Sequence, residues 1–167
     1  MGKFITSNYL QNKFDISTGM YSGNKINSYI DRYEEVYLAE MLGINLYNEF
    51  VADLTPSFVP TSTRFLKIYN PFMEEKDLRI LISKGIQDML AGFIYFEYLK
   101  DQITQSTPVG IVKQQGENSV PIHSHTTIYG RYNEAVKTYR AIQDYIFLNQ
   151  GTYDKFRGVL KQYAYWL

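Results

Sequence analysis

The hydrophobic residues of this chain recur mainly at spacings of three and four, which is the pattern of amphipathic helices. The first clear run predicts a helix from about residue 25 to 42, with Asn24 as its N-cap and Gly43 directly after its end. Its apolar positions are Ile26, Tyr29, Ile30, Tyr33, Tyr37 and Met41. A second, shorter helix is expected over 44–54, and a linker with two prolines follows it.

The centre of the chain predicts the longest and most apolar helix. Residues 64–72 fit either a short strand or a helical turn that ends at the Asn-Pro pair. From about 74 to 101, apolar residues cover a broad helical face, namely Leu78, Leu81, Ile82, Ile86, Met89, Leu90, Phe93 and Phe96. Gly85 and Gly92 are seven residues apart, so they fall on one side of this helix and predict a close approach to another helix.

A segment without helical periodicity, residues 104–126, interrupts the pattern. After it, two more helices are expected over 128–148 and 153–165, separated by Gly151. Residues 1–23 show weak periodicity and form an N-terminal arm. The whole chain, 1–167, therefore predicts one all-α domain, a bundle of about four to five helices with a β-hairpin or extended arm inserted at about 104–126.

The inserted arm alternates apolar and polar residues, as a strand does. A strand, a turn and a returning strand are expected, with key positions at Val109, Ile111, Val112, Gly116, Val120 and Ile122. A lone two-stranded hairpin is marginally stable in water. Its open edge therefore either pairs with another chain or folds back on the bundle, and the sequence leaves both arrangements open.

Composition narrows the function classes. The formal net charge is zero, whereas a general nucleic-acid binder usually has a large excess of basic residues. The chain has no cysteine, so thiolate metal sites and thiol nucleophiles are excluded. No window approaches the roughly 20 apolar residues of a membrane span. The 16 tyrosines and 10 phenylalanines exceed what one small core hides easily, which favours a protein that makes protein contacts.

Charge is distributed unevenly along the chain. Residues 31–54 contain six acidic residues and one basic residue, whereas residues 131–161 contain six basic and three acidic ones. The two segments either pair within one molecule or set the acidic helix of one copy against the basic helix of the next in a head-to-tail oligomer.

The residues offer little chemistry. His123 and His125 are two apart in a segment expected to be extended, so their side chains would project on the same side. A metal site normally needs three or four ligands, and no acidic residue lies within five positions of either histidine. Nucleophile-elbow, phosphate-loop and zinc-helix motifs are missing from the sequence. We therefore expect no catalytic residue, no metal and no cofactor.

Four quoted stretches, in this order, resemble the head–tail connector (adaptor) proteins of tailed bacteriophages, in particular the neck ring proteins of crAss-like phages. They are "YIDRYEEVYLAEMLGINLYNEF", "GFIYFEYLKDQ", "STPVGIVKQQGENS" and "YGRYNEAVKTYRAIQDYI". The likeness extends over about residues 24–150. It implies a helical subunit of a ring of about a dozen copies, seated between the portal protein and other neck or tail ring proteins. DNA would pass through this ring without sequence readout.

The resemblance gives the arm a role, because the hairpin of one subunit would pair with a neighbour. It also implies a virion protein that is present in the host cytoplasm during assembly. The aromatic tail, 164–167, provides either a second anchor or a lid on the chain's own core through Tyr165, Trp166 and Leu167. The alternative from another class is a small enzyme or effector that uses His123 and His125 as its site.

Overall fold

The structure is a computed structural model that describes residues 3–14, 16, 20–107, 110–113 and 124–164. Within these residues the chain forms six helices and two two-stranded antiparallel sheets, so the fold is mostly helical but not strictly all-α. The elements are α1 (Ser7–Phe14), α2 (Met20–Leu42), α3 (Ile44–Ala52), α4 (Thr63–Tyr69), β1 (Phe72–Lys76), β2 (Arg79–Ser83), α5 (Ile86–Ile103), β3 (Thr104–Thr107), β4 (Gly110–Lys113) and α6 (Ser124–Leu148).

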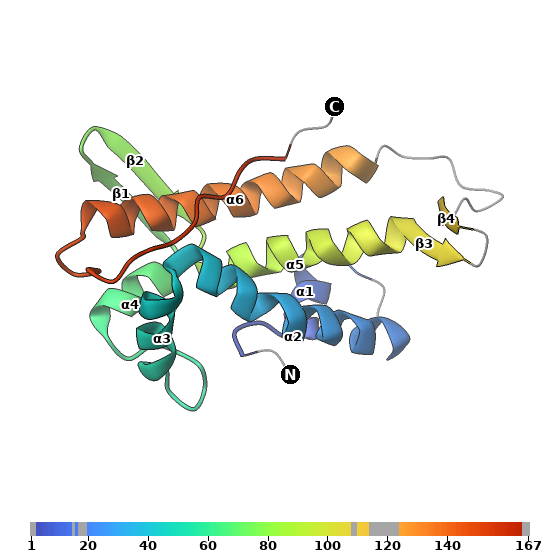
Figure 1. The fold of residues 1–167 in the computed structure, drawn as a ribbon, viewed down its shortest axis with the longest axis horizontal. Coiled ribbons are helices and arrows are strands. Elements are labelled where there is room, and N and C mark those ends of the chain that lie inside the picture. Colours follow the sequence, from blue (N-terminus) through green and yellow to red (C-terminus); the bar gives the residue numbers. More distant parts are fainter. Residues whose placement is uncertain (1–2, 15, 17–19, 108–109, 114–123, 165–167) are drawn as a thin grey trace.

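Three long helices, α2, α5 and α6, run along the length of the molecule (Figure 1). The helix α5 lies between the other two and packs against both. The short helices α3 and α4 and the β1–β2 hairpin gather at one end, and the β3–β4 hairpin extends from the opposite end (Figure 1).

The core is centred on Phe93 of α5, whose side chain is fully buried. Its ring stacks on Tyr37 of α2 at 4.6 Å and meets Tyr132 and Tyr139 of α6 edge-on at 5.4 and 6.0 Å between centroids. Offset and edge-to-face contacts of this kind add about 0.5–1.5 kcal/mol each beyond area burial. The aromatic contacts therefore hold all three long helices at one point.

Several tyrosines are buried, and their hydroxyls have partners. The Tyr37 hydroxyl donates to Glu97 at 2.9 Å, the Tyr139 hydroxyl to the Val159 carbonyl at 2.6 Å, and the Tyr153 hydroxyl to the Arg64 carbonyl at 2.6 Å. Burial raises the pKa of the Tyr37, Tyr139 and Tyr153 phenols above 10, so they act as donors throughout the physiological range. Part of the tyrosine content thus serves the core rather than the surface.

The N-terminal residues belong to the core as well. Phe4, Ile5 and Leu10 are all at least 96 % buried. Glu34 of α2, also buried, accepts the backbone N–H groups of Lys3 at 2.9 Å, of Phe4, and of Ile5 at 3.3 Å. Burial nevertheless raises the pKa of Glu34 above its usual value. These bonds hold the start of the chain against α2.

The predicted helix from 74 to 101 is wrong in its first third, where the β1–β2 hairpin stands instead. Phe72 pairs with Ser83 and Lys76 with Arg79, so two residues form the turn. Gly85, with φ +88°, lies between the end of β2 at Ser83 and the start of α5 at Ile86, rather than on the face of a helix. The error arises because apolar residues at 78, 81, 82 and 86 imitate helical spacing, although burial along β2 alternates.

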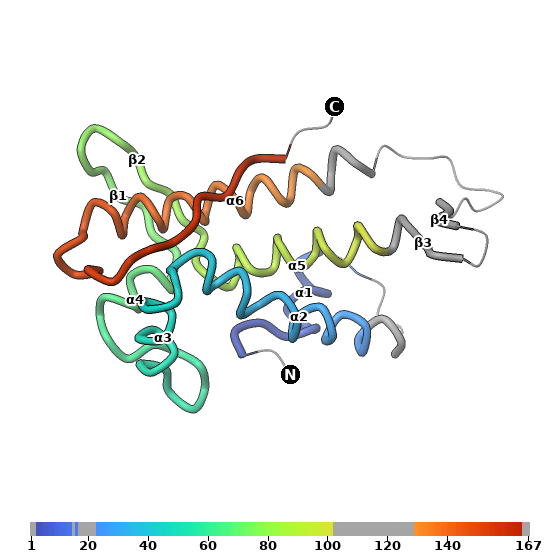
Figure 2. Tube along the Cα trace, in the orientation of Figure 1, coloured from blue at the N-terminus to red at the C-terminus, as the bar shows by residue number. Residues whose placement is uncertain are grey.

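The predicted last helix, 153–165, is also wrong. Residues 156–164 instead run extended, back along α6, and we call this segment the strap (Figure 2). The backbone N–H groups of Arg157 and Val159 donate to the carbonyls of Leu42 and Glu40 at 3.2 and 2.8 Å. Terminal helix carbonyls have no partner inside their own helix. An extended strap satisfies those of α2, which a helix at this position would not.

The other predictions have mixed outcomes. The predicted helices at 44–54 and 128–148 are confirmed as α3 and α6, and residues 64–72 contain most of α4 and the first residue of β1. Gly43 follows α2 directly, but Asn24 lies inside α2 rather than at its N-cap.

A hairpin does follow α5, but its two strands, β3 and β4, lie earlier in the chain than the predicted pair. Ile111 and Val112 lie in its second strand, opposite Ser106 and Gln105 of β3. Residues Val109, Gly116, Val120 and Ile122 lie outside the described residues.

The predicted close approach at Gly92 is confirmed by its geometry. A Cβ placed on Gly92 would lie 2.8 Å from the Cβ of Ala135 on α6 and 3.2 Å from the Arg131 carbonyl oxygen. The absence of a side chain at Gly92 therefore sets the distance between α5 and α6.

We expect Gly92→Ala to lower the free energy of unfolding by about 1–3 kcal/mol, because the two helices must move apart. Gly130→Ala is the matched control, since nothing lies within 4 Å of a Cβ there and the residue is inside α6. It should raise stability by about 0.5–1 kcal/mol. Urea unfolding followed by circular dichroism measures both. Equal effects of the two substitutions would contradict the assigned helix crossing.

Candidate assembly surface

The outer side of the β1–β2 hairpin carries four large apolar side chains exposed to solvent. Their exposed fractions are 73 % for Met73, 97 % for Leu78, 69 % for Ile80 and 52 % for Ile82. Met73 and Ile82 are directly paired across the two strands, so they stand on the same face. We call these four residues the hairpin face. Such clusters on soluble proteins mark interaction sites more often than chance exposure does.

The inner side of the hairpin is fixed to the helical body. Phe72 is buried and its ring lies 5.2 Å from that of Tyr145 on α6, while the Lys67 amine sits over both rings. Lys76 donates to the Asn149 side chain at 2.6 Å, close to the end of α6. The hairpin is therefore held in one position, and the hairpin face is presented in a fixed orientation.

The tip of the hairpin has an unusual backbone. Asp77 and Leu78 have φ values of 51° and 61°, the left-handed values that a two-residue turn of the I′ type requires. Glycine and asparagine are the usual residues there, and a left-handed leucine costs roughly 1–2 kcal/mol. A fully exposed leucine gains nothing within the monomer that would offset this cost. Strain of this kind often accompanies a contact role.

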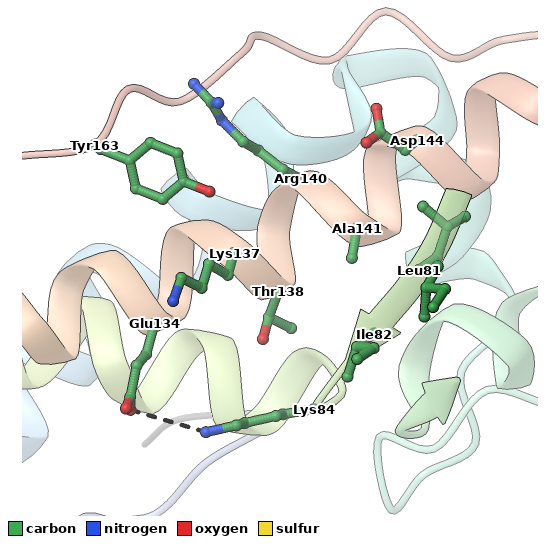
Figure 3. A pocket seen from close by; sticks show the side chains of 11 residues that line it. Leu81, Ile82, Lys84, Glu134, Lys137, Thr138, Arg140, Ala141, Asp144 and Tyr163 are labelled. Carbon is green, nitrogen blue, oxygen red and sulfur yellow. Dashed lines mark ion pairs between the residues drawn. The ribbon is translucent and has the colours of Figure 1, made fainter. Parts of the chain in front are cut away.

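A groove of about 550 Å³ lies between β2 and α6, beside the hairpin face. Its floor is apolar, formed by Ile80, Leu81, Ile82 and Ala141, and its rim is charged, formed by Lys84, Glu134, Lys137, Arg140 and Asp144. Figure 3 shows Lys84 and Glu134 forming an ion pair across one end, at 3.8 Å, and Tyr163 of the strap beside Arg140. The rim thus has three basic and two acidic side chains.

Two ion pairs join the acidic and basic segments within the chain. Glu40 of α2 forms an ion pair with Lys161, and Glu49 of α3 forms one with Lys155 and another with Arg64. The intramolecular interpretation of the charge pattern is therefore correct for these groups. The outer side of α2 still exposes Asp31, Arg32, Glu35 and the apolar Val36, and Glu35 pairs with Lys3.

The hairpin face was missed by the sequence reasoning, which placed Leu78 and Ile82 on a buried helical face. A signal for it existed, because alternation in "RILIS" after the "KDLR" turn fits a strand. Of the predicted interface residues, the structure describes Ile111 and Val112, and neither lies near the hairpin face. Ile111 and Val112 lie in the distal hairpin, at the opposite end of the molecule (Figure 1). Tyr165, Trp166 and Leu167, like the other predicted arm positions, lie outside the described residues.

The histidine arrangement predicted from the sequence is wrong for His125, which is the second residue of α6 and not part of an extended segment. His123 lies outside the described residues. Among the residues that are described, no group of three or more histidine, cysteine, aspartate or glutamate side chains could hold a metal ion. The alternative of an enzyme that uses this segment stays a prediction.

In the described part of the chain, none of the helices is both long and apolar enough to cross a bilayer. Comparison of this chain with protein-family models, with curated proteins and with solved structures finds no match.

Proposed function

We propose that this chain is a structural subunit of a homo-oligomeric ring and that it acts by assembly rather than by catalysis. The observation that carries the proposal is the hairpin face, an exposed apolar surface held rigidly on a folded body. The sequence resemblance supplies the setting, the neck of a tailed phage. There the ring would join the portal protein to further neck or tail ring proteins, and DNA would pass through its channel.

A head-to-tail contact between copies fits the placement of the two candidate surfaces. The strand β2 packs on α6, whereas α2 packs chiefly on α5, so the hairpin face and the outer side of α2 lie on different sides of the body (Figure 1). Unlike surfaces on one subunit give a heterologous contact, which closes into a ring when the rotation per subunit allows it.

Both surfaces carry charged groups beside apolar residues. The groove beside the hairpin face has three basic and two acidic side chains at its rim. The outer side of α2 exposes Asp31, Arg32 and Glu35 next to the apolar Val36, and Glu35 pairs with Lys3. Complementary charges of this kind fix register and orientation, while apolar burial supplies affinity. Fully burying one large apolar side chain contributes about 1.5–3 kcal/mol. In this proposal the α2 side of a second copy covers the hairpin face.

We expect native mass spectrometry to detect a closed oligomer, near a dozen copies by the family resemblance, either for the chain alone or after mixing with the portal protein of its phage. The physical reason is that each subunit carries both halves of the contact, so association continues until the ring closes. A chain that stays monomeric in both samples and does not bind the portal protein would contradict the proposed function.

A substitution at the tip residue Leu78 tests assembly without disturbing folding. We expect Leu78→Gly to abolish or strongly weaken the ring while the free energy of unfolding changes by less than about 1 kcal/mol. Glycine removes an exposed side chain and relieves the left-handed strain, and the greater freedom of the unfolded chain offsets that gain. Native mass spectrometry and urea unfolding report the two effects.

Asp77→Gly is the matched control, because it changes the neighbouring turn residue, which also has positive φ, and leaves the apolar side chain in place. It should assemble like the unchanged protein. Loss of assembly in both variants would assign the effect to the turn and not to the apolar contact.

A further inference from the structure

One edge of β2 carries backbone groups that no other strand uses. The pair Lys76–Arg79 closes a two-residue turn, so it exchanges both backbone hydrogen bonds, and every second pair along the two strands does the same. The N–H and C=O groups of Ile80 and Ile82 fall between these pairs and point away from β1. In the described part of the chain, none of the hydrogen bonds to other elements uses them. The strand β2 therefore presents an open edge.

This edge lacks the features that usually protect an open strand. Proteins blunt exposed edges with charged side chains, prolines or bulges, because unpaired backbone groups are a template for another chain. On the outer edge of β1, the outward-pointing backbone groups belong to Met73 and to the exposed acid Glu75. On β2 the corresponding residues are Ile80 and Ile82, which are both large, apolar and exposed. The edge of β2 is thus the better template of the two.

The open edge lies along the groove between β2 and α6. The described residues that line this groove include none of β1, so the groove is on the free side of β2 (Figure 3). Its volume of about 550 Å³ is within the range of about 300–1,000 Å³ of known ligand sites. On the α6 side, Thr138 and Ala141 have short side chains. An extended peptide suits this site, because its backbone can pair with the edge, whereas the backbone groups of a helix are already bonded to each other.

The charges of the groove distinguish its two ends. Glu134 pairs with Lys84, and Arg140 donates to a strap carbonyl at 2.9 Å. Among the described residues, Lys137 and Asp144 of α6 form no ion pair. They are seven residues apart, or about 10 Å along the helix. Figure 3 shows β2 running from the Asp144 end of the groove to the Lys84–Glu134 pair at the Lys137 end. An acidic group is therefore favoured at the Lys137 end and disfavoured at the other.

We infer that the open edge of β2 is a strand-addition site for an extended peptide segment of another protein, in which apolar residues follow an acidic one. The peptide adds antiparallel to β2, which is also the direction in which β1 pairs with it. Its acidic residue then meets Lys137, and alternate apolar side chains lie toward Ala141 and beside Ile80 and Ile82. The site goes beyond the proposed ring contact, because it uses the groove and the backbone of β2 and needs only one copy of this chain.

A short synthetic peptide tests the inference on the whole chain. The probe is acetyl-Glu-Val-Ile-Val-Thr-amide. In the antiparallel arrangement its two valines pair with Ile82 and Ile80, and its isoleucine lies opposite Leu81. We expect saturable binding by isothermal titration calorimetry. The amide signals of Ile80 and Ile82 should shift in the NMR spectrum of the isotope-labelled protein.

Two modified peptides separate backbone pairing from general stickiness. Methylation of both valine nitrogens removes the donors to β2 and keeps every side chain. It should weaken binding about tenfold or more, because two peptide hydrogen bonds are lost. The reversed peptide, acetyl-Thr-Val-Ile-Val-Glu-amide, moves the acid from Lys137 to Asp144 and should also bind more weakly. Lys137→Ala should remove the difference between the two orders.

Proline substitutions on the two edges form a matched pair. Ile82→Pro removes an outward N–H without breaking the pairing with β1, since proline is tolerated at an open edge. Met73 is directly opposite Ile82, so Met73→Pro makes the same change on the outer edge of β1. Ile82→Pro should abolish peptide binding, and Met73→Pro should bind like the unchanged protein. Circular dichroism checks that both variants are folded.

The inference is wrong if neither order of the peptide binds, if the methylated peptide binds as tightly, or if both proline variants lose binding equally. It is also wrong if the Ile80 and Ile82 signals shift with protein concentration in the absence of peptide, because a second copy then covers the edge. Native mass spectrometry decides the proposed function separately, since peptide binding does not require a ring.

Discussion

The contacts of Phe93 with rings from α2 and α6 fix how the three long helices meet, and the other parts of the structure are arranged around this point. Tyr37 and Tyr139, which touch Phe93, also direct their hydroxyls to Glu97 and to the Val159 carbonyl. One set of side chains thus supplies both apolar burial and hydrogen bonds. It leaves ring faces toward the strap, and the Lys161 amine occupies them.

The end of α2 imposes the second constraint. This helix ends where α3 begins, so its last carbonyls point into the protein and need donors from elsewhere. The Gln143 side-chain amide donates to the Met41 carbonyl at 2.9 Å, and backbone N–H groups of the strap donate to the Glu40 and Leu42 carbonyls. The extended strap is therefore a consequence of α2's position, and Gly158 is needed because its backbone passes against the Met41 carbonyl.

Much of the helical framework could be predicted from periodicity, because α2, α3 and α6 bury one side and expose the other, while the broad apolar surface of α5 fits its place between α2 and α6. The β1–β2 hairpin could not be separated from α5 by spacing, since its apolar residues at 78, 81 and 82 continue the helical series. Only alternation and a turn in "KDLR" favoured strands. The strap could not be predicted at all from local sequence, because its partners are carbonyls of residues 40 and 42. The hairpin face was missed for the same reason as the hairpin.

The hairpin face and the strap differ in how the rest of the chain holds them. The hairpin face is apolar and lies outside the core, so it gains free energy only when another surface covers it. The strap, in contrast, is held on its own chain by charge-assisted and peptide hydrogen bonds, which specify its position. Leu78 has no comparable support, because its left-handed backbone carries a side chain that is 97 % exposed.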